Sequence, residues 1–232
     1  MRCSLFGKLS AKRDFIALAT PRPFLELWEP WIQACMSASQ HQLGSTWKQA
    51  FLTAPLWRFW LGADLAGTTV MGVFMPSVDG VGRYYPLTLL AMADADSAIP
   101  PPDLAAQDPW FAIAEEFLLA TLDQSRRFDD ISAQLDSLPA PQAQPIIDNS
   151  AGILRLGQAM AGSITAGKTF QDALGALRRS HHGTSGTATY WWTEGGGDFP
   201  PMALCAHRLP DPFHFANMLT GRLTGEAAEG GI

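Results

Sequence analysis

Apolar residues recur along this chain with two periods, which predict helices in some segments and strands in others. Steps of three and four residues, typical of one face of a helix, follow Pro21–Pro23 and connect Phe24, Leu27, Trp28, Trp31 and Cys35. Pro30 interrupts this run and removes a backbone donor. We therefore expect either a kinked helix or a second helix that begins near Glu29.

A residue pattern typical of β-strands begins after Pro55. The segments 56–62 and 68–75 are rich in aromatic and β-branched residues and are separated by a short turn. They predict an antiparallel hairpin near residues 56–76, in which Trp57 and Phe59 face one way while Arg58 and Trp60 face the other. The nearly unbroken apolar run 85–92 is typical of a strand buried on both faces.

Helices and strands alternate through most of the remaining chain. Helical periodicity marks residues 110–122, 129–138, 170–180 and 212–219, and strand texture marks 188–193 and 203–207. This alternation predicts an α/β domain whose sheet carries helices on both faces, mixed in direction because it includes the antiparallel hairpin. We expect a single domain over residues 1–223, with 224–232 as a frayed tail.

Composition narrows the function classes. The chain has 232 residues, of which 47 % are hydrophobic and 16 % charged, so it is not a disordered protein. A formal net charge of −6 argues against nucleic-acid binding, which favours a basic surface. Seven basic and three acidic residues in 1–60 contrast with three basic and thirteen acidic in 61–150. This asymmetry is either a dipole that steers a protein partner or an ordinary mixed surface.

The absence of a recognisable targeting signal and the irregular spacing of the cysteines favour a cytoplasmic protein. Cys3, Cys35 and Cys205 have no regular spacing, so neither a disulfide framework nor a zinc module is indicated. The N-terminus lacks the pattern of a secretory signal. Because no apolar stretch is long enough to span a bilayer, we expect no membrane insertion.

Catalytic and metal-binding motifs are absent from the sequence. It contains neither a Gly-Lys-Ser/Thr phosphate loop nor a Gly-x-Ser-x-Gly nucleophile elbow. The pair His181–His182 and the set Asp198, Cys205 and His207 lack the ligand spacing of a zinc module. We therefore predict no catalytic residue, no metal and no cofactor.

The segment Pro76–Arg83 allows two interpretations. Ser77 and Asp79 can bond to nearby backbone N–H groups and shape a turn, and Arg83 can fork onto Asp79, Asp14 or a carboxylate of a partner. The segment is thus either a turn held together internally or a binding loop. We expect the structural role, in which Asp79 and Arg83 fix the loop and Asp14 lies nearby.

Several stretches together resemble one family. They are Phe6-Gly7-Lys8-Leu9 with Asp14-Phe15, Trp28-x-x-Trp31, the block from Ala54 to Phe59, the long run from Gly72 to Thr88, and Tyr190-Trp191-Trp192. The run Pro-Ser-Val-Asp to Pro-Leu-Thr is the most specific. The chain resembles the TagF (ImpM) family of type VI secretion accessory proteins, closely over residues 5–123 and more loosely over 185–220. Ser10 and Arg13 stand where the family usually has Pro and Gly.

The resemblance implies a three-layer α/β/α sandwich and a regulatory role. Members are cytoplasmic and hold type VI secretion inactive after translation, together with a forkhead-associated scaffold protein and in a pathway with a threonine kinase and phosphatase. Asp14, Ser77, Asp79, Arg83, Trp28 and Trp31 are the motif residues that carry either a structural or a partner-binding role. The alternative hypothesis is a small ligand-binding or enzymatic domain that uses Asp14, Asp79 and Arg83 around a pocket.

Overall fold

The computed structural model describes residues 1–145, 153–156, 159–162 and 186–222. In these residues a seven-stranded sheet has the order β11-β10-β3-β4-β5-β1-β2. Its strands are β1 (Cys3–Gly7), β2 (Ile16–Leu18), β3 (Trp57–Leu61), β4 (Val70–Met75), β5 (Leu87–Met92), β10 (Ala188–Thr193) and β11 (Met202–His207). Two short pairs, β6 (Ser97–Ala98) with β7 (Gln144–Pro145) and β8 (Ile153–Leu156) with β9 (Ala159–Gly162), form separate two-stranded sheets.

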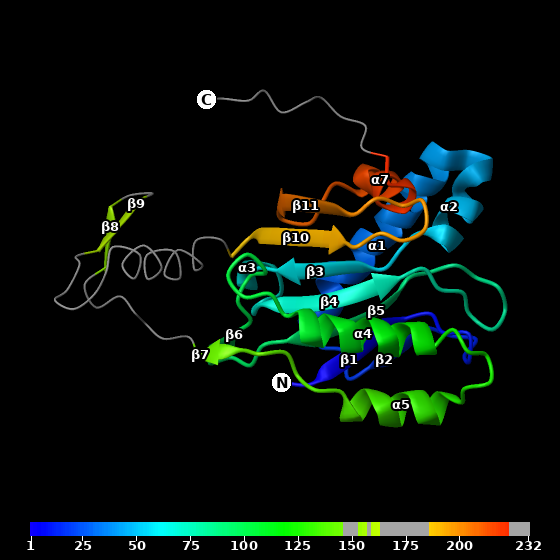
Figure 1. Ribbon diagram of the computed structural model, residues 1–232, viewed down its shortest axis with the longest axis horizontal. Coiled ribbons are helices and arrows are strands. Elements are labelled where there is room, and N and C mark those ends of the chain that lie inside the picture. The colour runs from blue at the N-terminus through cyan, green and yellow to red at the C-terminus, as the bar shows by residue number, and fades with distance from the viewer. Residues whose placement is uncertain (146–152, 157–158, 163–185, 223–232) are drawn as a thin grey trace.

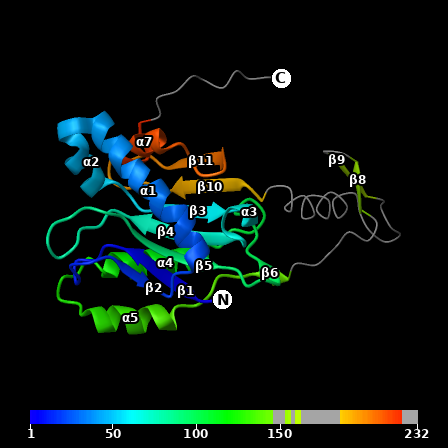
Figure 2. The same ribbon diagram turned by 180° about the vertical axis from the view of Figure 1, so that it is seen from behind.

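Helices cover both faces of the sheet, which gives the expected α/β/α sandwich. Helices α4 (Asp108–Ala120) and α5 (Phe128–Ser137) lie on the face seen in Figure 1. The opposite face, seen in Figure 2, is crossed by α1 (Arg22–Leu43), with α2 (Trp47–Thr53) and α7 (Phe215–Thr220) beside it. The short helices η1 (Gly44–Thr46), α3 (Ala63–Ala66) and η3 (Pro212–His214) complete the described elements.

Strand direction differs from the expectation of a mixed sheet, because every pairing in the seven-stranded sheet is antiparallel. The predicted hairpin is confirmed as β3 and β4. The loop 76–86 then returns the chain directly into β5, so β3, β4 and β5 form a meander. The helices α1 and α4 instead carry the chain between strands that are not neighbours, so among the described elements no helix connects two parallel adjacent strands.

Side-chain alternation along β3 divides the core between the two faces as predicted. Trp57 and Phe59 belong to the cluster under α1, α2 and α7. Trp60 belongs to the cluster under α4 and α5. Arg58 points to the same face as Trp60 and is also buried.

Helix α1 continues through Pro30 from Arg22 to Leu43, so the alternative of a second helix starting near Glu29 is wrong. Phe24, Trp28 and Trp31 are buried on one face of α1, and that burial offsets the hydrogen bond that the proline removes. The predicted helix 170–180, the tail 224–232 and the pair His181–His182 lie outside the described residues.

Candidate functional site

The loop that joins β4 to β5 folds around the carboxylate of Asp79. Asp79 Oδ1 accepts hydrogen bonds from the backbone N–H groups of Val81 at 3.0 Å and Arg83 at 2.9 Å. The Asp79 N–H donates to the Arg83 carbonyl at 3.1 Å, and the Gly82 N–H donates to the Asp79 carbonyl at 3.0 Å. The loop is therefore a turn held together internally, as the structural interpretation expects.

Two cations neutralise Asp79. Lys8 Nζ lies 3.2 Å and Arg83 Nε 2.7 Å from Oδ2, and the exposed fraction is 0 % for the Asp79 side chain, 7 % for Lys8 and 54 % for Arg83. Burial alone would raise the pKa of Asp79. The hydrogen bonds from the Arg83 backbone and side chain, from Val81 N–H and from Lys8 outweigh burial and hold this pKa well below its ordinary value. Asp79 is thus an anion between two cations at neutral pH.

The same network joins two loops that are far apart in the sequence. Ser77 Oγ donates to the Lys8 carbonyl at 2.8 Å, and Gly80 N–H donates to the Lys12 carbonyl at 2.9 Å. The Arg83 guanidinium donates to the carbonyl oxygen of Arg13. Loop 8–15, between β1 and β2, is therefore fastened to loop 76–86 by charge and by main-chain contacts.

Asp14 does not take part in this network. It is exposed, and in the described part of the chain no polar contact joins it to Asp79 or Arg83. Its neighbour Phe15 packs edge-on against Tyr85, with ring centroids 4.7 Å apart, while Lys8 Nζ lies 5.0 Å from the Phe15 ring centre. The structure therefore brings Ser77, Asp79 and Arg83 together and leaves Asp14 outside.

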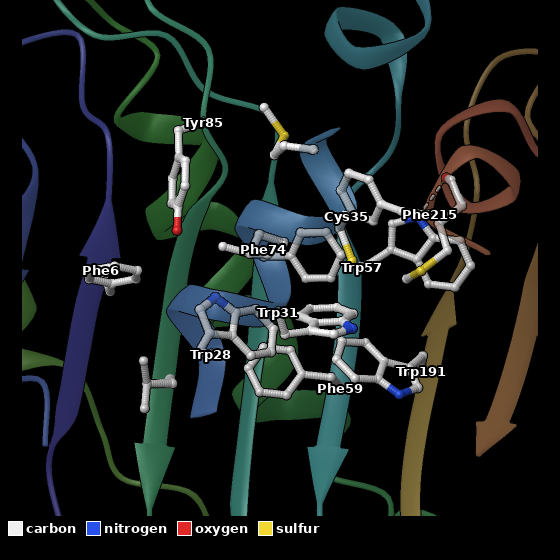
Figure 3. Packing of buried hydrophobic residues seen from close by; sticks show 14 of the residues in the cluster. Phe6, Trp28, Trp31, Cys35, Trp57, Phe59, Phe74, Tyr85, Trp191 and Phe215 are labelled. Atoms are coloured by element: carbon white, nitrogen blue, oxygen red, sulfur yellow. Dashed lines mark hydrogen bonds between the residues drawn. The ribbon is translucent and has the colours of Figure 1, made fainter. Parts of the chain in front are cut away.

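The two motif tryptophans of α1 belong to an aromatic core (Figure 3). The Trp28 ring centroid lies 4.7 Å from that of Phe59 and 5.8 Å from that of Trp191, and the Trp31 centroid lies 4.9 Å from those of Trp28 and Trp191. Trp31 Nε1 donates to the Pro210 carbonyl at 2.8 Å, whereas Trp28 Nε1 has no acceptor among the described residues. Both side chains are buried, so they support the fold and do not form a contact surface.

A second ion cluster surrounds the buried Arg58 on β3. Its Nε lies 2.6 Å from Glu115 Oε1 and its second nitrogen 3.0 Å from Oε2, a bidentate pair. Glu194 Oε1 adds a contact at 2.7 Å. Burial would lower the pKa of Arg58, but Glu115 and Glu194 raise it above its ordinary value. Sequence analysis missed this cluster, although a charged residue inside the apolar strand 57–61 signals a buried partner.

Of the candidate metal ligands, Asp198, Cys205 and His207 lie in the described part of the chain and do not assemble there. Cys205 is exposed, and His207 Nε2 lies 2.8 Å from Thr187 Oγ1. No group of three potential ligands occurs in the part of the chain that the structure describes.

One small hollow lies under α2 and α7. It has a cavity volume of about 10 Å³, room for about one water. Phe51, Trp57, Phe74, Phe215 and Met218 are among its lining residues, and Asp14, Asp79 and Arg83 are not. The residues of the pocket hypothesis therefore do not converge on this hollow.

The protein is an α/β/α sandwich in which the side chains of the most specific sequence motif, in loop 76–86, form an ion network around the buried Asp79. The profile of the family described as "TagF N-terminal domain, Type VI secretion system-associated" matches residues 4–138. The chain therefore belongs to this family, as the sequence motifs predict.

A solved structure is similar over the whole chain. The crystal structure of PA0076 from Pseudomonas aeruginosa PAO1 has 32 % sequence identity and a TM-score of 0.82, and the alignment covers 99 % of each chain. No curated protein matches significantly. Within the described residues, no helix combines the length and the apolar character needed to cross a membrane.

Proposed function

We propose that this protein is a cytoplasmic, non-enzymatic accessory protein that represses type VI secretion after translation. It acts by binding a forkhead-associated scaffold protein, in a pathway with a threonine kinase and phosphatase. The observation that carries the proposal is membership of the type VI secretion-associated family over residues 4–138. The similarity to PA0076 extends the shared fold to 99 % of the chain.

The use of polar residues in the specific motif supports a binding protein over an enzyme. Asp79 is already satisfied by Lys8, Arg83 and backbone N–H groups, so it is not available as a general base at neutral pH. Ser77 Oγ donates its hydrogen bond to the Lys8 carbonyl, which cannot take up a proton. Ser77 is therefore not activated as a nucleophile. These side chains build a rigid loop, which is what a docking platform requires.

Deletion and affinity purification test the proposal together. Removing the gene should raise type VI secretion during growth, and the tagged protein purified from the same cells should carry the scaffold with it. Restoring the gene on a plasmid should return secretion to its starting level. Unchanged secretion combined with the absence of any secretion component in the purified material would contradict the proposal.

A further inference from the structure

Three loops that are distant in sequence meet at one end of the sheet. They are residues 8–15, 76–86 and 121–127, named here the three-loop end, and both views of the ribbon place them together (Figures 1 and 2). Gly80 N–H bonds to the Lys12 carbonyl at 2.9 Å. Lys12 Nζ lies 4.1 Å from the ring centre of Phe128, directly after the third loop. The three loops therefore form one continuous surface.

Apolar side chains stand exposed on this surface. Phe15, Val81 and Leu122 each come from a different loop and are 49 %, 55 % and 55 % exposed. A single exposed apolar residue is ordinary, but three from three separate loops at one end of the molecule are typical of a contact surface.

Positive charge accompanies these apolar residues. Outside the buried Lys8–Asp79 pair, the three loops hold five cations, among them Lys12, Arg13 and Arg83, against the two carboxylates Asp14 and Asp123; one of the five, Arg127, pairs with Asp129 of α5 at 3.4 Å. This excess occurs in a chain whose formal net charge is −6. Arginine and aromatic side chains are enriched where protein interfaces bind most tightly, and a cationic rim selects an acidic partner surface.

The loops are held in place before any partner arrives. Asp79 fixes the 76–86 loop and, through Lys8 and the Arg13 carbonyl bound by Arg83, the 8–15 loop as well. A surface that is already ordered loses little conformational entropy when it binds, so more of the contact energy contributes to affinity. The buried motif residues thus act indirectly, by presenting Phe15, Val81 and the cations.

We propose that the three-loop end is the surface that binds the scaffold protein, through an acidic face of that protein with an apolar centre. This inference rests on the proposed function and assigns its contact to Lys12, Arg13, Phe15, Val81, Arg83 and Leu122. Ser77 and Asp79 lie buried within these loops, Trp28 and Trp31 lie in the aromatic core under α1, and all four keep structural roles.

Calorimetric titration of the full-length protein into the purified scaffold protein tests the assignment. The double variant Lys12→Glu/Arg13→Glu reverses two charges, and Val81→Asp places a carboxylate at the exposed loop tip. Each should weaken the affinity by about tenfold or more. Arg22→Glu is the matched control, since Arg22 is a cation on α1 with an 88 % exposed side chain and should change the affinity by less than about twofold.

The outcomes separate this inference from the proposed function. Wild-type affinity that falls with rising salt, and falls with both variants while their melting temperatures are kept, supports the three-loop end. Unchanged affinity in both variants overturns the assignment and leaves the function standing. A wild-type protein that does not bind the scaffold overturns both. If light scattering shows a self-associated wild type that the variants disrupt while scaffold binding persists, the occupant is a second copy and the inference fails. Should the double variant unfold, Val81→Asp decides alone.

Discussion

Lys8 and Asp79 form an ion pair shielded from water, with Lys8 Nζ 3.2 Å from Oδ2 and exposed side-chain fractions of 7 % and 0 %. One residue follows β1 and the other lies in the loop before β5, so the pair joins the first motif segment to the most specific one. Its buried position makes loss of one partner costly, because the other charge remains in a medium that solvates it poorly.

Asp79→Asn should lower the free energy of unfolding by about 3–5 kcal/mol, the usual cost of breaking a buried pair. The amide keeps the size of the carboxylate and can still accept from backbone N–H groups, but it leaves Lys8 without a counter-charge. Urea denaturation at pH 7 measures the change. Asp94→Asn is the control: Asp94 pairs with the N-terminus but is 61 % exposed, so the expected loss is below about 1 kcal/mol. Equal losses in the two variants would contradict the special role of Asp79.

Acid should remove the advantage of the native carboxylate. The pKa of folded Asp79 lies well below its unfolded value of about 3.9. Ionised Asp79 therefore stabilises the fold fully above about pH 3.9, and this contribution is lost progressively as pH falls from there toward the lower pKa of the folded state. The difference in unfolding free energy between the native protein and Asp79→Asn should therefore narrow when pH is lowered from about 6 to about 3. Denaturation curves across this range measure the narrowing, and a constant difference would refute it.

Trp28 and Trp31 should respond differently to loss of the indole nitrogen. Each change to Phe removes ring volume from the aromatic core, but only Trp31→Phe also leaves the Pro210 carbonyl without its donor. We expect Trp31→Phe to cost about 1 kcal/mol more than Trp28→Phe, the typical net value of one hydrogen bond. Thermal and urea unfolding of the two variants give the comparison. Trp28→Phe being the more costly change would show that the buried indole of Trp28 contributes mainly through its volume.

Gly72 is required by close packing at the centre of the sheet. A β-carbon there would lie 2.5 Å from both the Leu89 carbonyl oxygen and a ring carbon of Phe59. Gly72→Ala should therefore push the aromatic core apart and cost about 3 kcal/mol or more, at the upper end of overpacking. Gly67→Ala is the matched control, because Gly67 has a φ of 82° but open space around it, and about 1 kcal/mol is expected. Melting temperatures rank the two variants.

Arg58 should not tolerate lysine. Arg58→Lys keeps the charge but loses the two-point contact with Glu115, so we expect a loss of about 1–3 kcal/mol. Glu194→Gln removes a more exposed contact of the same arginine, since Glu194 is 74 % exposed, and should cost less than about 1 kcal/mol. Urea denaturation measures the loss of unfolding free energy in each variant. Equal losses would contradict a dominant role for the contact between Arg58 and Glu115.

Local patterns predicted elements well and long-range pairing poorly. Three predictions depend on side chains that are adjacent in sequence, and all three are confirmed. They are the hairpin of β3 and β4, the buried strand that ends at Met92, and the helix that begins at Asp108. The antiparallel direction of the whole sheet depends on which distant strands meet, and periodicity carries no such information.

The candidate site shows the same limit. Turn chemistry predicted that Asp79 and Arg83 would fix their own loop, and this is confirmed. The third member, Lys8, lies more than 70 residues away and carries no sign in the sequence that its charge is buried. Turn residues place Val81 in a loop, but how far Phe15 and Val81 are exposed is set by how the loops meet.

Strand β10 lies between β3 and β11, more than 120 residues beyond β3, and its Trp191 ring packs 5.5 Å from Phe59. The segment matched by the family profile ends at residue 138, before either C-terminal strand. A chain truncated at residue 138 would leave β3 as an exposed edge strand with unpaired backbone amides. It would also lack the Trp191 ring of the aromatic core. The segment matched by the family model is thus shorter than the sheet, and amino-terminal fragments of this chain that end there should self-associate when expressed by themselves.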